Sequence, residues 1–343
     1  MKSSTRSLLN GILIFGVPVG ILVYTLCNGD LPAALRELGN ADIRWMLLAL
    51  LSMAGFLFLS GESAWSSLKR QGYLLPRRLT ASAAIVGEFY SNITPGASGG
   101  QPMEIYRLHR YGIPVGVGTS TTMTRFVAYH IVAFVLTTVL GAVYWPFLKA
   151  QVGLNMPILI FGYAMNTAAT ATVLLLSLVR QPVHWLIDKI VAIGSKLHTI
   201  RDAEKTRQSF RSSADTFYDS VQVLRRHKAE VLRQLLLCGM QLFLYMCVPY
   251  FIYRGLGLSG VSGPKIVMMA LMEYMSAAYV PLPGASGARE GVFSLYFDQI
   301  FTGANGLAAM LIWRFITYYS TLLVGASVSV VSRLTLPGKK KDE

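Results

Sequence analysis

Long apolar runs separated by short polar segments dominate this chain. The runs at about 8–26, 43–61, 117–144, 157–179, 231–253 and 305–333 each hold the roughly 20 apolar residues that are needed to cross the hydrocarbon core of a bilayer. The pattern therefore predicts an all-α polytopic membrane protein with about six transmembrane helices. We expect one transmembrane domain over residues 1–343.

Two further apolar stretches, at about 80–112 and 264–303, are interrupted by Pro95-Gly96 and Pro283-Gly284. Proline followed by glycine ends a helix and frees backbone groups that need hydrogen-bond partners. Within lipid, such a break is tolerated only where protein or a wet cavity surrounds it. We therefore predict two re-entrant helical hairpins that turn near the middle of the membrane.

These two breaks belong to an internal repeat. Pro-Gly-Ala-Ser-Gly occurs at 95–99 and again at 283–287, and Arg-Phe-x-x-Tyr occurs at 125–129 and again at 314–318. The separation between loop and arginine is the same in both copies to within one residue. Two matches in register indicate a duplication, with repeat 1 at about 43–144 and repeat 2 at about 231–333.

The basic residues predict the orientation of the chain. Lys and Arg outnumber Asp and Glu by 31 to 17, which gives a formal net charge of +14. They gather at 62–79, at 180–230 and in the C-terminal tail, which we therefore place in the cytoplasm together with the N-terminus. The basic segments all lie on one side only if each hairpin returns to the side of the membrane from which it enters. The spans before the two hairpins then cross in opposite directions, so we expect the two repeats to be inverted. No compact basic domain stands apart from the apolar runs, so nucleic-acid binding is not expected.

The segment at about 181–230 is too charged to cross a membrane, but its apolar residues recur at helical spacing. Trp185, Leu186 and Ile190 belong to one apolar stripe, and Phe210 and Phe217 belong to a second one. We predict a cytoplasmic amphipathic helical insert that lies on the inner leaflet.

Inverted repeats with broken helices place the substrate site of a transporter at the repeat interface. Each loop opens a half-helix whose N–H groups and dipole favour an anion, and Ser98 is a possible cap for the first one. Guanidinium groups bind phosphate bidentately, and Arg289 follows the second loop closely. The candidate substrate-binding residues are Arg125, Arg314, Arg289, Ser98, Gly99, Ser286, Gly287, Tyr129 and Tyr318.

Four acidic residues accompany this candidate site, namely Glu88, Glu104, Glu273 and Glu290. Each could form an ion pair with an arginine and so hold a hairpin in place, or it could carry a proton for coupled transport. The sequence leaves a scaffolding role and an anion-binding role open for the arginines, and both can hold together.

Enzymatic signatures are absent from the sequence. It contains no P-loop, no HExxH motif, no cluster of Cys and His, and no G-x-S-x-G sequence around Ser98 or Ser286. We therefore expect no enzymatic activity, no metal site and no cofactor.

The paired Pro-Gly-x-x-Gly loops, Arg289-Glu290-Gly291 and the spacing to Arg314 resemble the flippase-like membrane domain of lysyl-phosphatidylglycerol synthase/flippase (MprF) proteins. Stand-alone relatives of the YbhN and AglD type are similar. The resemblance covers about 8–333 and implies a bacterial inner-membrane protein that moves lipids or lipid-linked sugars between leaflets. It does not extend to the aminoacyl-transferring cytosolic domain of the two-domain members. The first loop departs from the pattern, because it continues as Gly100-Gln101 and lacks an Arg-Glu pair.

The leading hypothesis is therefore a lipid flippase that translocates a phosphate-bearing lipid or lipid-linked headgroup between leaflets. One alternative is a secondary transporter of a small anion. Another is a non-transporting regulator or scaffold of a lipid- or glycan-modifying enzyme. The expected partner is a membrane phospholipid or lipid-linked substrate, while a homo-oligomer or an enzyme partner is left open. The sequence does not specify the lipid, the direction of transport or the energy source.

Overall fold

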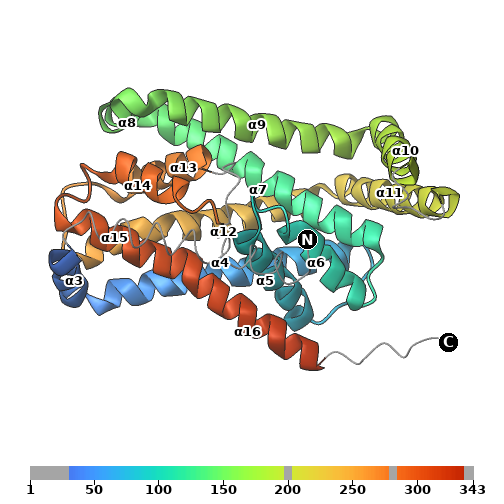
Figure 1. Ribbon diagram of the computed structural model, residues 1–343, viewed down its shortest axis with the longest axis horizontal. Coiled ribbons are helices and arrows are strands. Elements are labelled where there is room, and N and C mark those ends of the chain that lie inside the picture. Colours follow the sequence, from blue (N-terminus) through green and yellow to red (C-terminus); the bar gives the residue numbers. More distant parts are fainter. Residues whose placement is uncertain (1–30, 197–202, 278–283, 336–343) are drawn as a thin grey trace.

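The computed structural model describes residues 31–196, 203–277 and 284–335, and every regular element in those ranges is a helix (Figure 1). Five helical segments there are long and apolar enough to cross a membrane, which confirms the predicted fold class. They match five of the predicted runs, and the run at about 8–26 lies outside the described residues. The five segments are α4 (Ile43–Arg70), α7 (Val115–Val143), α8 (Trp145–Val152) with α9 (Met156–Leu178), α12 (Lys228–Gly255), and α15 (Ala304–Arg314) continued by a π-helical turn, η3 (Phe315–Tyr319), and α16 (Ser320–Thr335).

Both interrupted stretches form a pair of helices with the repeated loop before the second helix. In the second stretch, the predicted break at Pro283 lies outside the described residues, and the loop is described from Gly284. In the first, α5 (Arg77–Ile93) packs against α6 (Gly100–Arg110), and in the second, α13 (Gly263–Ala277) packs against α14 (Ala288–Phe297). Figure 1 shows the first pair in the half of the bundle near α10 and α11. The second pair lies in the opposite half, near α8 and α3 (Leu31–Asn40).

The helices that precede the two hairpins are equivalent in the repeat, and they run antiparallel to each other. Near the end of α4, Ser66 Oγ donates to Glu230 near the start of α12 at 2.8 Å. Towards the start of α4, Ser52 Oγ donates to the Leu244 carbonyl, further along α12, at 2.8 Å. The two copies of the repeat therefore pass through the bundle in opposite directions, as an inverted duplication requires.

The two loops share a backbone conformation that is rare for residues with a side chain. Gly96 and Gly284 both have φ near 59°, and the alanines that follow them, Ala97 and Ala285, have φ of 55° and 47°. Left-handed φ angles disfavour a Cβ. The same unfavourable conformation at equivalent alanines shows that the duplication extends to the detailed geometry of the loops.

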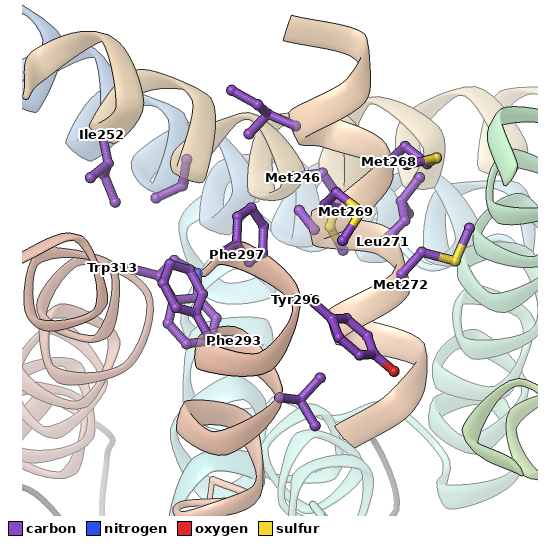
Figure 2. Packing of buried hydrophobic residues seen from close by; sticks show 14 of the residues in the cluster. Met246, Ile252, Met268, Met269, Leu271, Met272, Phe293, Tyr296, Phe297 and Trp313 are labelled. Atoms are coloured by element: carbon purple, nitrogen blue, oxygen red, sulfur yellow. The ribbon is translucent and has the colours of Figure 1, made fainter. Parts of the chain in front are cut away.

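The largest buried core joins α12 to the second hairpin and α15. Figure 2 shows methionines of α12 and α13 beside a stack of aromatic rings from α14 and α15. The Phe293 ring lies 4.5 Å from the Phe297 ring and 4.8 Å from the Trp313 ring, measured between centroids. In a membrane protein, such close contacts stabilise the fold by packing, because lipid tails are as apolar as the side chains.

The charged insert forms two helices, α10 (Arg180–Lys196) and α11 (Ala203–Arg226), as the periodicity predicts. An ion pair of 2.7 Å between Arg211 and Asp188 joins the two helices. α11 also lies against α7 at Gly116, where a Cβ would come within 2.6 Å of the Ser213 carbonyl oxygen. The insert is thus packed onto the bundle, and its place on the cytoplasmic side stays a prediction.

Candidate functional site: a central cavity between the two loops

A cavity of about 390 Å³ lies where the two repeated loops approach each other. Gly96, Ala97 and Ser98 of the first loop line it, and so do Gly284 and Ala285 of the second. Further predicted site residues in its lining are Glu88, Glu104, Arg125, Tyr129 and Arg289. The lining does not include Gly99, Ser286, Gly287, Arg314, Tyr318, Glu273 or Glu290, which lie behind or beside it.

Arg125 of α7 lines the cavity and has hydrogen-bonding capacity to spare. Its Nη1 forms an ion pair with Glu104 of α6, and its Nη2 donates to Ser60 Oγ of α4 at 2.6 Å. The side chain is buried, with 9% of the residue exposed, and Nε has no hydrogen-bond partner within the part of the chain that the structure describes. A buried donor of this kind favours a ligand that accepts its hydrogen bond.

Arg289, the residue after the first position of α14, is fully engaged. Its Nε and Nη2 donate to the two carboxylate oxygens of Glu273 at 2.8 and 2.7 Å, and its Nη1 donates to Tyr245 Oη at 2.7 Å. The guanidinium also lies 4.9 Å from the centre of the Trp313 ring. This bidentate pair fastens α14 to α13 and leaves little capacity for a ligand.

Arg314 holds the second loop. Its Nε donates to Glu290 at 2.6 Å, and its Nη2 approaches the Gly284 carbonyl oxygen at 3.4 Å. The ring of Tyr318, one turn later, packs so tightly on the loop that a Cβ on Gly284 would come within 2.2 Å of it. The Tyr318 hydroxyl reaches the Asn92 carbonyl oxygen of α5 at 3.4 Å, which connects the two repeats.

Each of the three arginines is therefore neutralised by a glutamate, which is the scaffolding arrangement that the sequence left open. Glu88 differs from the other three acids. It lines the cavity from α5, and no ion pair or hydrogen bond of its side chain occurs within 31–196, 203–277 and 284–335. The described site has three arginines and four glutamates, so it is not the positively charged chamber that the arginines alone predict.

The two half-helix N-termini differ in what they offer a ligand. The N–H of Gly287 at the start of α14 donates to Glu290 Oε2 at 2.6 Å, so this end binds a carboxylate of its own chain. The first copy has Pro102 at the equivalent position, and there the Gly99 N–H is accepted by Thr94 of the preceding loop instead of by an acid on the helix. Gly100 and Gln101 of that helix start line the cavity.

Ser98 does not cap α6, contrary to the expectation from its position. Its hydroxyl donates to the Pro95 carbonyl oxygen at 2.9 Å. Instead, Thr94 Oγ1 accepts the Gly99 N–H at 2.8 Å, and this bond closes the loop. The reason is geometric, because the left-handed turn at Gly96 and Ala97 directs Ser98 back toward the start of the loop. The N–H groups of Gly99 and Gly100 are thus bonded within the loop and Pro102 has none, which leaves the N–H of Gln101 for a ligand at this helix start.

The wall of the cavity that α12 and α13 supply was not predicted from the sequence. Cys238, Gln241 and Tyr245 of α12 and Tyr274 of α13 contribute to it. The Tyr274 ring lies 6.2 Å from the Tyr129 ring and 6.5 Å from the Tyr245 ring. The polar residues of α12 are three or four positions apart, and this helical spacing is the signal that could have identified them.

The chain was compared with known proteins. A protein of Methanothermobacter thermautotrophicus (strain Delta H) called "UPF0104 membrane protein" is 27% identical over 256 residues, which covers 71% of this chain and 70% of that protein. Residues 8–325 match the family described as "Lysylphosphatidylglycerol synthase TM region". That match takes in both hairpins, both loops and all three paired arginines, so the chain belongs to the lysylphosphatidylglycerol synthase transmembrane-region family.

Proposed function

We propose that this protein translocates a phosphate-bearing lipid or lipid-linked headgroup between the two leaflets of the membrane. The observation that carries the proposal is that the unpartnered Nε of Arg125 and the free N–H of Gln101 at the start of α6 belong to residues that line one cavity together with both loops. A phosphate group accepts hydrogen bonds from guanidinium and from helix N-terminal N–H groups alike. A cavity between oppositely directed hairpins is the geometry of alternating access.

The ion pairs have a separate role in this mechanism. Glu104 binds one nitrogen of Arg125 and so orients the guanidinium, leaving Nε for the headgroup. The pair between Arg289 and Glu273 fastens the two helices of the second hairpin into one body. Two such bodies can move against each other around a headgroup that stays near the midplane, while the acyl chains of the lipid remain in the bilayer.

The same proposal includes the kind of ligand, the absence of a chemical reaction and the membrane in which the protein lies. The family is described by the membrane region of a lipid synthase, which supports a lipid as the ligand. The chain would move this lipid without changing it chemically. The abundance of Lys and Arg between α4 and α5 and in α10 and α11 favours an inner-membrane protein with both termini in the cytoplasm.

The test uses purified protein in vesicles of phosphatidylethanolamine and phosphatidylglycerol. A trace of phosphatidylglycerol labelled with nitrobenzoxadiazole on one acyl chain reports movement, because dithionite bleaches only the outer leaflet. We expect wild-type protein to expose the inner-leaflet label faster than protein-free vesicles do. The double variant Arg125→Gln with Glu104→Gln should fall to the protein-free rate, and it avoids leaving a single charge buried.

The matched control is Arg254→Gln. Arg254 belongs to repeat 2 and lies over the Trp45 ring, 5.4 Å from its centre, and it does not line the cavity. The Arg254→Gln variant should move labelled lipid at the rate of the wild type. Wild-type rates in the double variant would overturn the proposed site. Uptake of radiolabelled inorganic phosphate without lipid movement would favour the small-anion transporter instead.

A further inference from the structure

A stripe of polar residues leads along α12 into the cavity. Its members are three or four positions apart, so they share one face of the helix. That face is buried, because only 8% of Glu230, 1% of Gln234 and 4% of Gln241 is exposed. The stripe consists of Glu230, Gln234, Cys238, Gln241 and Tyr245, and the last three line the cavity.

Serines of α4 form hydrogen bonds with this stripe, and we call the resulting row of polar contacts between α4 and α12 the seam. Glu230 accepts from Ser66 Oγ and from Gln234 Nε2, both at 2.8 Å. Ser63 Oγ then donates to Gln234 Oε1 at 2.5 Å and lies 3.9 Å from Cys238 Sγ. Polar contacts thus continue between α4 and α12 from the first turn of α12 to the wall of the cavity.

Glu230 is the unusual member of the seam, because its buried carboxylate is held by neutral donors. Within the part of the chain that the structure describes, no lysine or arginine forms an ion pair with it. In membrane proteins, buried acidic groups of this kind mark paths for protons.

Glu88 stands at the cavity end of the seam. Arg125 of α7 and Glu104 of α6 are the charged groups closest to it, and they are bonded to each other. Cys238, the seam residue that Ser63 reaches, lines the same cavity as Glu88, so the seam and this carboxylate meet at one space. The cavity residues that α4, η3 and α16 contribute carry no charge; they are Met53, Phe56, Thr317 and Thr321.

We propose that Glu88 is the proton-binding carboxylate of the cavity and that the seam from Glu230 carries its proton. One proton passes from water at the end where α12 begins to Glu88, which changes from carboxylate to carboxyl. The proton returns to water when the cavity opens to the other side of the membrane. This inference rests on the proposed function and adds an energy source to it, namely a proton gradient.

The first experiment detects protonation of the Glu88 carboxylate directly and does not depend on lipid transport. Infrared difference spectra are recorded between high and low pH on the protein in nanodiscs of phosphatidylethanolamine and phosphatidylglycerol. The wild type should show a protonated-carboxyl band that Glu88→Gln removes. Glu62→Gln, which alters a partly exposed acid paired with Arg77, should leave that band unchanged. An identical spectrum for Glu88→Gln and the wild type would overturn the assignment of Glu88.

The second experiment tests the seam by its rate. After a rapid pH jump, Gln234→Leu should delay the appearance of the Glu88 band several-fold. The matched control is Gln71→Leu, because Gln71 also bonds buried side chains, at Thr121 and Ser120, but lies outside the seam. Equal delays in the two leucine variants, or none in either, would refute the path through Gln234.

The vesicle assay then separates this inference from the proposed function. A pH gradient should change the rate of labelled-lipid movement in the wild type several-fold, and Glu88→Gln should abolish this dependence on the gradient. If the wild type moves no labelled lipid while the infrared results hold, the lipid assignment fails and the proton site stands. Lipid movement that ignores the gradient in the wild type would overturn the coupling.

Discussion

The Nε of Arg314 lies 2.6 Å from Glu290 Oε1, and the second oxygen of the same carboxylate accepts the Gly287 N–H at 2.6 Å. One glutamate therefore joins the span after the second hairpin to the loop at its tip. The first repeat has a similar ion pair between Arg125 and Glu104, but there the loop lacks an acid of its own. Both copies therefore have an ion pair between the arginine of the following span and the half-helix after the loop, and in the second copy the same glutamate also binds the loop.

The ion pair between Arg314 and Glu290, which clamps the second loop, leads to a prediction about the stability of the fold. Arg314→Gln leaves the largely buried Glu290, whose side chain is 17% exposed, without its cation, so it should destabilise the protein by about 3 kcal/mol. Adding Glu290→Gln should restore part of that loss, because two neutral amides need no counter-charge. Denaturant unfolding in detergent micelles, followed by tryptophan fluorescence, measures both variants against the wild type. If the single and double variants lost the same stability, the pair would not act as a clamp.

The two loop glycines make a matched pair for a second prediction. Gly96 and Gly284 have the same φ of 59°, so alanine at either position carries the same backbone strain, about 1 kcal/mol. They differ in surroundings. A Cβ at Gly96 meets nothing within 4 Å, whereas at Gly284 it would lie 2.2 Å from the Tyr318 ring. Gly284→Ala should therefore be clearly less stable than Gly96→Ala in the same unfolding measurement. Equal losses would mean that Tyr318 does not pack on the loop.

The helices and their breaks were predictable from the sequence because their causes are local. Apolar runs of sufficient length specify spans, and Pro-Gly inside such a run specifies an interruption. The repeated motifs predicted that the two interruptions would share one geometry, and the matching angles at Ala97 and Ala285 agree with this.

The partners of the arginines were not predictable in the same way. Arg125 and Arg314 reach carboxylates that lie 21 and 24 positions earlier, and several glutamates were available to each of them. Which pairs form depends on how the half-helices pack. The charge balance of the cavity, and with it the distinct position of Glu88, therefore required the fold. The polar stripe of α12 could have been predicted from its helical spacing, but its residues lie inside an apolar run that was interpreted only as a span.

A third prediction concerns the reach of water to the two loop serines. Ser98 is exposed and lines the cavity, whereas only 1% of Ser286 is exposed. In a background in which Cys27, Cys238 and Cys247 are replaced by serine, Ser98→Cys should react with a membrane-impermeant maleimide much faster than Ser286→Cys. Mass spectrometry of the labelled protein measures both rates. Similar rates at the two positions would contradict the closed second loop.

The last prediction tests the close approach of α5 and α6, which places the N-terminus of α6 at the cavity. A Cβ on Gly100 would lie 1.9 Å from Ser91 Oγ and 3.0 Å from the Gly87 carbonyl oxygen, so Gly100→Ala must push the two helices apart. We expect the free energy of unfolding to fall by roughly 1–3 kcal/mol because of this overpacking, together with slower lipid movement.

Gly291→Ala is the matched control on α14, because nothing lies within 4 Å of its Cβ position. That variant should gain up to about 1 kcal/mol from helix propensity. Unchanged stability in Gly100→Ala would show that the first hairpin does not depend on this contact, and the position of the α6 N-terminus would then need another explanation.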